Sequence, residues 1–166
     1  MSNSSPLALF LTWTVYGTFL PGDRRGWRHR QDGIKPAQPL LEQWHRDRLN
    51  YDVVLLNADM QAIAETAITE ICTFRTWRLW AVSVRSNHAH VLLSAPNYRP
   101  TLVRDQLKAK ATTALRAAFE IWQNRPVWAA NGDIEFLDND QDIEQSAIYV
   151  SEAQDRKCRD QVHRDA

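Results

Sequence analysis

The order of helix-like and strand-like patterns constrains the fold of this 166-residue chain more than any other feature of its sequence. Segments 58–74 and 101–122 carry apolar residues at the three-and-four spacing of an amphipathic helix, and a third such pattern covers 142–154. Short apolar runs typical of strands lie at 7–14, 79–84, 88–93 and 134–137. The order β-α-β-β-α-β-α predicts an α+β domain of the ferredoxin-like βαββαβ type. Such a domain is a four-stranded antiparallel sheet with two helices on one face, here with an additional C-terminal helix.

One long segment, 19–57, departs from this regular alternation. It holds several Pro and Gly residues in its first half and little periodicity, although 40–49 is compatible with a short helix. We therefore expect a single domain over 1–166, interrupted by a loop-rich, basic insertion at about 19–57.

Overall composition indicates a cytoplasmic protein. The formal net charge is zero, and the two cysteines form no metal-binding spacing or disulfide framework. The N-terminal residues lack the basic and apolar regions of a signal peptide, and no run of eighteen apolar residues occurs. The expectation is a protein of the reducing cytosol that is neither secreted nor membrane-spanning.

Charge is segregated along the chain although the total is zero. Segment 24–35 has five basic residues and one acidic residue, and segment 99–125 has six basic and two acidic residues. In contrast, segment 131–155 has eight acidic residues and no basic one. The two basic segments are candidates for contact with an anionic partner, or simply for a solvated surface.

A histidine pair in the third strand is the first candidate for chemistry. His88 and His90 are two residues apart, so on a strand their side chains point to the same face with Cα atoms roughly 6–7 Å apart. Two imidazoles in this arrangement can share one metal ion. The alternative is a pair of solvent-facing histidines on an edge strand.

Four parts of the chain together are typical of a known family. They are Phe10–Asp23 (FLTWTVYGTFLPGD), Val84–Val91 (VRSNHAHV), the helix around Leu107–Ala109, and Ala147–Val150 (AIYV). Over nearly its whole length the chain resembles the single-tyrosine HUH transposases, in particular the REP-associated tyrosine transposases and their insertion-sequence relatives. Segment 88–90 is similar to the histidine–hydrophobe–histidine motif of that family.

The resemblance implies a metal-dependent enzyme that cuts single-stranded or hairpin DNA and transfers the strand. Tyr149 would be the nucleophile that forms a 5′-phosphotyrosine link, and His88 and His90 would bind Mg²⁺ or Mn²⁺. Two other functions stay open: a hairpin-DNA-binding protein that has lost catalysis, and a metal-dependent nuclease that uses activated water. Relatives occur as monomers and as dimers, so a homodimer also stays open.

The third metal ligand is ambiguous in this sequence. Relatives carry Gln or Asn four residues after the tyrosine, where this chain has Ala153. On a regular helix Glu152 lies roughly 60° and Gln154 roughly 140° around the axis from Tyr149. Geometry favours Glu152 and residue type favours Gln154. The same helix places Tyr149 off the apolar face, so its hydroxyl is free to point at a partner surface.

Candidate phosphate contacts are basic residues of the two positive segments. Those in the insertion are Arg24, Arg25, Arg28 and Arg30, and those on the expected polar side of the second long helix are Arg104 and Lys108.

Overall fold

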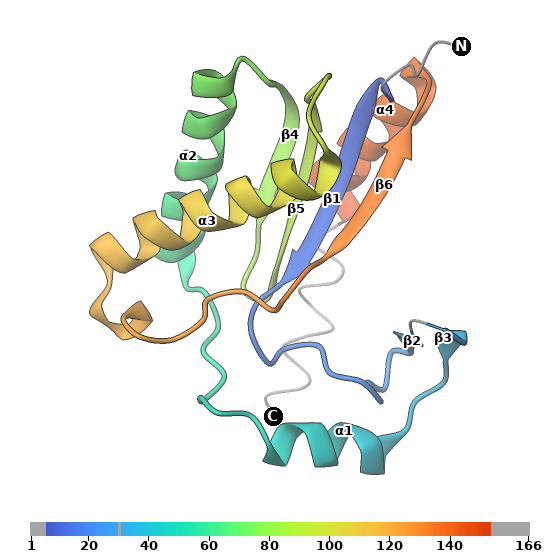
Figure 1. Ribbon diagram of the computed structural model, residues 1–166, viewed down its shortest axis with the longest axis vertical. Coiled ribbons are helices and arrows are strands. Elements are labelled where there is room, and N and C mark those ends of the chain that lie inside the picture. The colour runs from blue at the N-terminus through green and yellow to red at the C-terminus, as the bar shows by residue number, and fades with distance from the viewer. Residues whose placement is uncertain (1–5, 30, 154–166) are drawn as a thin grey trace.

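The computed structural model describes residues 6–29 and 31–153 and contains the four-stranded antiparallel sheet that the sequence predicts (Figure 1). Its strands are β1 (Ala8–Thr14), β4 (Arg78–Val84), β5 (His88–Ser94) and β6 (Asp133–Leu137). Their spatial order is β4-β5-β1-β6, and every neighbouring pair is antiparallel. With helical connections from β1 to β4 and from β5 to β6, this order is the ferredoxin-like arrangement.

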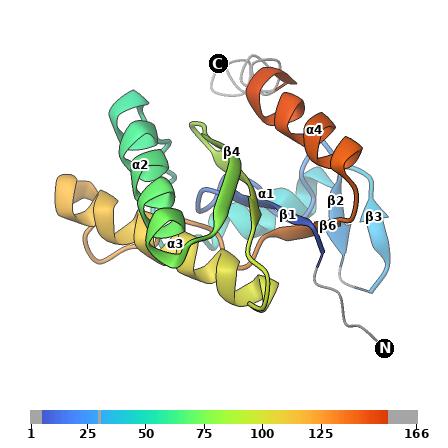
Figure 2. The ribbon, with the colours of Figure 1, turned by 90° about the horizontal axis from the view of Figure 1, so that it is seen from above.

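Helices cover both faces of the sheet. Helices α2 (Ala58–Arg75) and α3 (Pro100–Ala118) lie on one face, and α4 (Asp140–Ile148) lies on the other (Figure 2). Strand β1 alternates accordingly: Leu9, Leu11 and Trp13 enter the main core under α2 and α3, whereas Ala8 and Phe10 belong to a smaller cluster near α4. The sheet therefore has a core face and a second face where the last helix packs.

Helix α2 begins and ends where its sequence provides caps. The Asn57 side chain accepts a hydrogen bond from the Met60 backbone N at 2.9 Å, and the helix stops at Thr76, which has a φ of +61°. The sequence pattern extends the apolar face of this helix to Phe74. That prediction is wrong for the last turn, because Phe74 is 79% exposed. After the turn at Thr76, Trp77 is buried instead.

Cys72, on the buried side of α2, should be chemically inert in the folded protein. It is 1% exposed, and burial raises the pKa of its thiol from 9.0 to about 11. At pH 8, iodoacetamide is expected to leave Cys72 unmodified in native Cys158→Ser protein and to modify it in urea, as mapped by mass spectrometry. Rapid native labelling at pH 8 would contradict this burial.

The pKa of the Cys72 thiol is higher in the folded protein than in the unfolded chain. The thiol's contribution to the free energy of unfolding is therefore complete below pH 9 and declines through about pH 11.

Helix α3 differs from its prediction at both ends. Its N-cap is Arg99 and Pro100 takes the first helical position, so Thr101, where the helical pattern was expected to begin, lies inside the helix. The helix ends at Ala118 rather than continuing to Trp122. A separate 3₁₀ turn, η1 (Glu120–Trp122), carries Trp122 into the core.

Within the described ranges 6–29 and 31–153, no helix combines the length and apolar content needed to cross a membrane.

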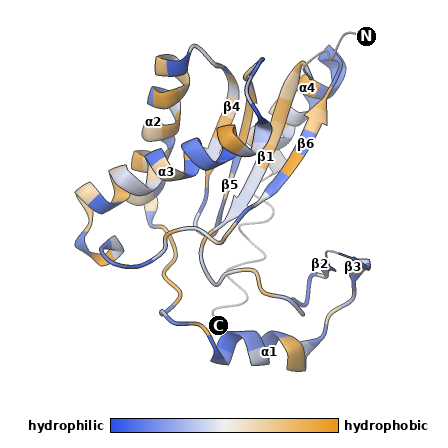
Figure 3. Cartoon of the chain, viewed as in Figure 1, coloured by the Kyte–Doolittle hydropathy of each residue, from blue (hydrophilic) through white to orange (hydrophobic). Residues whose placement is uncertain are grey.

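The segment expected to be a loop-rich insertion contains three short elements. The helix compatible with 40–49 is present as α1 (Pro39–Asp47), which has no buried residue and is largely hydrophilic beyond its first turn (Figure 3). A small hairpin of β2 (Trp27–His29) and β3 (Gly33–Lys35), which the sequence did not predict, precedes it.

Gly132, just before β6, allows the chain to approach β1 closely. Its φ is +138°, and a Cβ atom there would lie 2.7 Å from the Thr12 backbone O. Gly132→Ala is expected to lower the free energy of unfolding by about 1–3 kcal/mol, which lowers Tm by roughly 2–12 °C in a calorimetric scan. Gly33→Ala is the matched control, because Gly33 also has a positive φ but no atom within 4 Å of the added Cβ. Equal Tm losses in the two variants would contradict the contact at Thr12.

Candidate active site

The histidine pair lies on an interior strand, on the face that α4 covers. Strand β5 is paired with β4 on one side and with β1 on the other, with His90 opposite Thr12 and His88 opposite Thr14. His88 is 7% and His90 is 4% exposed, and their ring centroids are 4.8 Å apart. The predicted same-face arrangement is confirmed, and the alternative of solvent-facing histidines on an edge strand is wrong.

Each imidazole makes a hydrogen bond through its Nδ1 atom. The His88 Nδ1 lies 2.6 Å from Asn87 Oδ1, and the His90 Nδ1 lies 2.8 Å from Thr12 Oγ1. Neither Thr12 nor Asn87 was among the predicted site residues. The strand alternation that buries Leu11 and Trp13 in the main core also places Thr12 on the histidine face, so that signal was present in the sequence.

Helix α4 positions Tyr149 near the sheet. The side chain of Asn139 caps the helix by accepting from the Asp142 backbone N at 2.8 Å, so the helix starts at Asp140, two residues earlier than predicted. It ends at Ile148, and Tyr149 opens a π-helical turn, η2 (Tyr149–Ala153). Ile143 and Val150 are buried on either side of the tyrosine in sequence.

The Tyr149 ring packs against two rings of the sheet, those of His90 and Phe10. Its centroid is 5.7 Å from that of His90 and 6.2 Å from that of Phe10. Phe10 also stacks on His90, with centroids 5.3 Å apart and planes 17° from parallel. The Tyr149 ring thus lies against the sheet, although the sequence placed it off the apolar face of its helix. A single chain brings together the phenol and the imidazole pair.

A groove of about 780 Å³ opens beside these rings, between α4 and the β1–β6 pair. Thr12, His90 and Tyr149 line it, and Arg28 reaches it from β2. Three carboxylates from the acidic segment also line it: Asp133, Glu135 and Asp142. The groove thus combines the aromatic and imidazole rings with one guanidinium and several acidic groups.

The residues after Tyr149 form a π-helical turn, whereas the candidates for the third metal ligand were compared on a regular α-helix. Hydrogen bonds in a π-turn run from residue i to i+5, a wider ring than in a regular α-helix. Glu152 lies in this turn and Gln154 lies outside the described residues, so both stay candidates for the third ligand. In the part of the chain that is described, no three His, Cys, Asp or Glu side chains gather as a metal-binding group.

Among the described arginines of the insertion, Arg28 lies at this site. Arg28 lines the groove, Arg24 is exposed, and Arg25 pairs with Asp23 at 2.8 Å, whereas Arg30 lies outside the described residues. Arg24, Arg25 and Arg28 are exposed, which is compatible with the predicted contacts to an anionic partner.

Arg104 and Lys108 serve the packing of α3 on the opposite face. Arg104, expected on a polar side, is only 8% exposed and donates from Nη1 to the Gly132 backbone O at 3.3 Å. Lys108 Nζ donates to the backbone O atoms of Ala129 and Asn131, at 2.7 and 2.6 Å. Burial, and secondly the charge of Arg104, lower the pKa of Lys108. The structure does not bring these two cations to the histidines.

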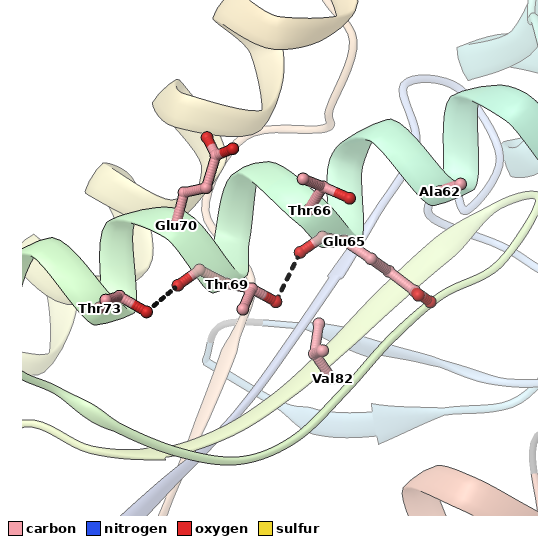
Figure 4. A pocket seen from close by; sticks show the side chains of 7 residues that line it. All are labelled: Ala62, Glu65, Thr66, Thr69, Glu70, Thr73 and Val82. Carbon is pink, nitrogen blue, oxygen red and sulfur yellow. Dashed lines mark hydrogen bonds between the residues drawn. The ribbon is translucent and has the colours of Figure 1, made fainter.

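A second groove lies between α2 and the edge strand β4 (Figure 4). Its lining includes Glu65 and Glu70 and three threonines, Thr66, Thr69 and Thr73. Glu65 Oε1 accepts from the Val84 backbone N at 2.8 Å, which ties the helix to the strand. Among its described lining residues there is no cation, so this groove is poorly suited to a polyanion.

Comparison with known proteins identifies a family, and several solved structures match the chain, among them the two that follow. Residues 48–145 match a family model described as IS200-like transposase. A candidate transposase from Deinococcus radiodurans R1 is 17% identical, with 88% of this chain and 89% of that one covered and a TM-score of 0.49. A REP-associated tyrosine transposase bound to a REP hairpin is 13% identical, with 90% and 68% covered and a TM-score of 0.48. No curated protein matches the chain.

Proposed function

Because the chain belongs to the IS200-like transposase family, we propose that it cuts and rejoins single-stranded DNA through a covalent link to Tyr149. One observation carries this proposal: the Tyr149 ring lies 5.7 Å from the His90 ring within one polypeptide. A nucleophile and a pair of metal-ligating side chains can then act on the same phosphate.

In the proposed reaction the Tyr149 Oη attacks a backbone phosphorus. The new O–P bond replaces the bond to the 3′ oxygen, which leaves as a 3′-hydroxyl after gaining a proton, while the 5′ phosphate stays on the tyrosine. Rejoining to another 3′-hydroxyl reverses these steps and needs no nucleotide triphosphate. A phenol has an ordinary pKa of about 10 and is a weak nucleophile, so the reaction requires positive charge beside the phosphate.

His88 and His90 are the residues that would hold a divalent cation, Mg²⁺ or Mn²⁺. Both Nδ1 atoms are already engaged, by Asn87 and Thr12, so the Nε2 atoms are the ligating ones, and neutral imidazoles with such partners are typical metal ligands. Glu152 and Gln154 remain the two candidates for the third ligand. When bound, the cation supplies the positive charge that offsets the developing negative charge on the phosphate.

The partner in this proposal is single-stranded or hairpin DNA. Arg28, at the groove, and its neighbours Arg24, Arg25 and Arg30 would contact phosphates. The carboxylates of Asp133 and Glu135 repel phosphate, so the strand is expected to keep away from the β6 side of the groove. One chain supplies both the phenol and the imidazoles, so the proposed chemistry needs no exchange of helices in a homodimer.

A second candidate function is hairpin binding without cleavage. It is favoured by Ala153, a non-ligating residue at the place where relatives carry a Gln or Asn ligand. A metal-dependent nuclease that uses activated water is a third reading, in which Tyr149 has no covalent role.

A labelling experiment separates the three functions. The protein is incubated with Mn²⁺ and a pool of single-stranded hairpin oligonucleotides with randomised flanks, labelled at either the 3′ or the 5′ end, and resolved on a denaturing gel. The proposed function predicts a protein adduct with the 3′ label and a short free fragment with the 5′ label. A binding protein gives neither product, and a nuclease gives fragments from both labels without an adduct.

A further inference from the structure

We propose that Asn87 and Thr12 are positioning residues: Asn87 holds His88 with a proton on Nδ1, Thr12 holds the orientation of the His90 ring, and each presents the Nε2 of its histidine as the ligating atom. The role in metal binding rests on the proposed function, whereas the tautomers and orientations are properties of the metal-free fold. Each of the two residues places a side-chain oxygen within hydrogen-bond distance of the Nδ1 atom of one histidine.

Asn87 determines the tautomer of His88. Its Oδ1 atom can only accept a hydrogen bond, so the His88 Nδ1 at 2.6 Å must be the donor, and the proton of the neutral ring then lies on Nδ1. Asn87 is buried and well anchored: its backbone O accepts from the Val15 N at 2.8 Å and from the Thr18 hydroxyl at 3.2 Å. The acceptor therefore stands in a fixed place before any metal arrives.

Thr12 and Phe10 determine the orientation of His90. The Thr12 hydroxyl lies 2.8 Å from the His90 Nδ1, and the nearly parallel Phe10 ring limits tilting of the imidazole plane. A hydroxyl accepts or donates according to its partner, so it accommodates a proton on Nδ1. With Nδ1 bonded to Thr12, rotation of the ring would lose both the hydrogen bond and the stacking contact.

The two hydrogen bonds each hold one imidazole of the pair, and they come from different parts of the fold. Thr12 is on the central strand β1, 78 residues from His90 in sequence, whereas Asn87 directly precedes His88. Partners that orient metal-bound histidines commonly change metal affinity by about 10–100-fold when they are removed. A preformed arrangement reduces the reorganisation that binding would otherwise require.

Tautomers can be read directly from long-range ¹H–¹⁵N spectra of metal-free protein at pH 8. We expect the Nδ1–H pattern for His88, whose Nδ1 faces the Asn87 Oδ1 acceptor. An Nε2–H pattern for His88 in the unmodified protein would overturn the proposal.

Substitutions then test the link to metal affinity through Mn²⁺ titration followed by electron paramagnetic resonance. Asn87→Ala and Thr12→Val are expected to weaken Mn²⁺ binding by about 10–100-fold, whereas Asn87→Asp and Thr12→Ser, which keep an oxygen acceptor, should stay near the unmodified affinity. Thr12→Val retains the side-chain shape and keeps the test valid if Asn87→Ala does not fold. Unchanged Mn²⁺ affinity in Thr12→Val would overturn the role of Thr12. Loss of the DNA adduct with intact tautomers and Mn²⁺ binding would instead count against the proposed function alone.

Discussion

Tyr149→Phe is expected to abolish the covalent protein–DNA adduct and to lower strand cleavage by on the order of 10³-fold or more. The substitution removes the proposed Oη nucleophile but keeps the ring that packs against Phe10 and His90, so the fold and the imidazole pair should persist. The measurement is adduct yield from 3′-labelled DNA on a denaturing gel, with thermal unfolding recorded in parallel.

Tyr98→Phe is a suitable control for this experiment. Tyr98 is partly exposed, and its ring meets the edge of Trp77, which belongs to the core under α2 and α3. This variant should form the adduct at the normal rate. If Tyr149→Phe still cleaved DNA at that rate, a water-activating nuclease would replace the tyrosine mechanism.

His90→Ala is expected to weaken Mn²⁺ binding by at least about 100-fold and, with it, to remove adduct formation. It deletes one of the two proposed imidazole ligands, which lies at the centre of the ring cluster with Phe10 and Tyr149. It also leaves a cavity in a buried site, so a lower Tm should accompany the loss. The measurements are Mn²⁺ titration, adduct yield and calorimetry on the same preparation.

His45→Ala provides the comparison for the histidine variant. His45 lies on α1, away from the paired imidazoles, with its ring against Trp44. It should bind Mn²⁺ and form adduct as the unmodified protein does. If His90→Ala kept the unmodified Mn²⁺ affinity, the ion would have to bind elsewhere and the assignment of the ligands would fail.

The order of elements could be predicted from the sequence because each element carries its own periodicity. The two-residue period of a strand also sufficed to place His88 and His90 on one face. Errors occurred where an element ends. Phe74 fits the apolar pattern of α2 but lies beyond its buried part, and Trp122 is reached by a 3₁₀ turn instead of a longer α3. Local patterns do not specify where tertiary packing stops a helix.

The environment of the site could be predicted less well because it depends on long-range contacts. The bond between Thr12 and His90 joins residues 78 positions apart, and no local pattern reports it. The contacts of the Tyr149 ring with Phe10 and His90 join the last helix to strands β1 and β5, which are far from it in sequence. Arg104 was expected to face solvent, yet its guanidinium meets the loop at Gly132. In each of these cases, contacts with distant segments decided the outcome.

Strand β1 serves both layers of the protein at once, and this restricts how its length can change. Leu11 and Trp13 belong to the main core while Phe10 and Thr12 meet the histidine on the neighbouring strand. Inserting or deleting one residue within the strand would exchange these two sets, placing a hydroxyl in the apolar interior and an indole against the imidazoles. Changes in length are therefore tolerable only in the connections outside β1, such as the long one between Gly17 and Asn57.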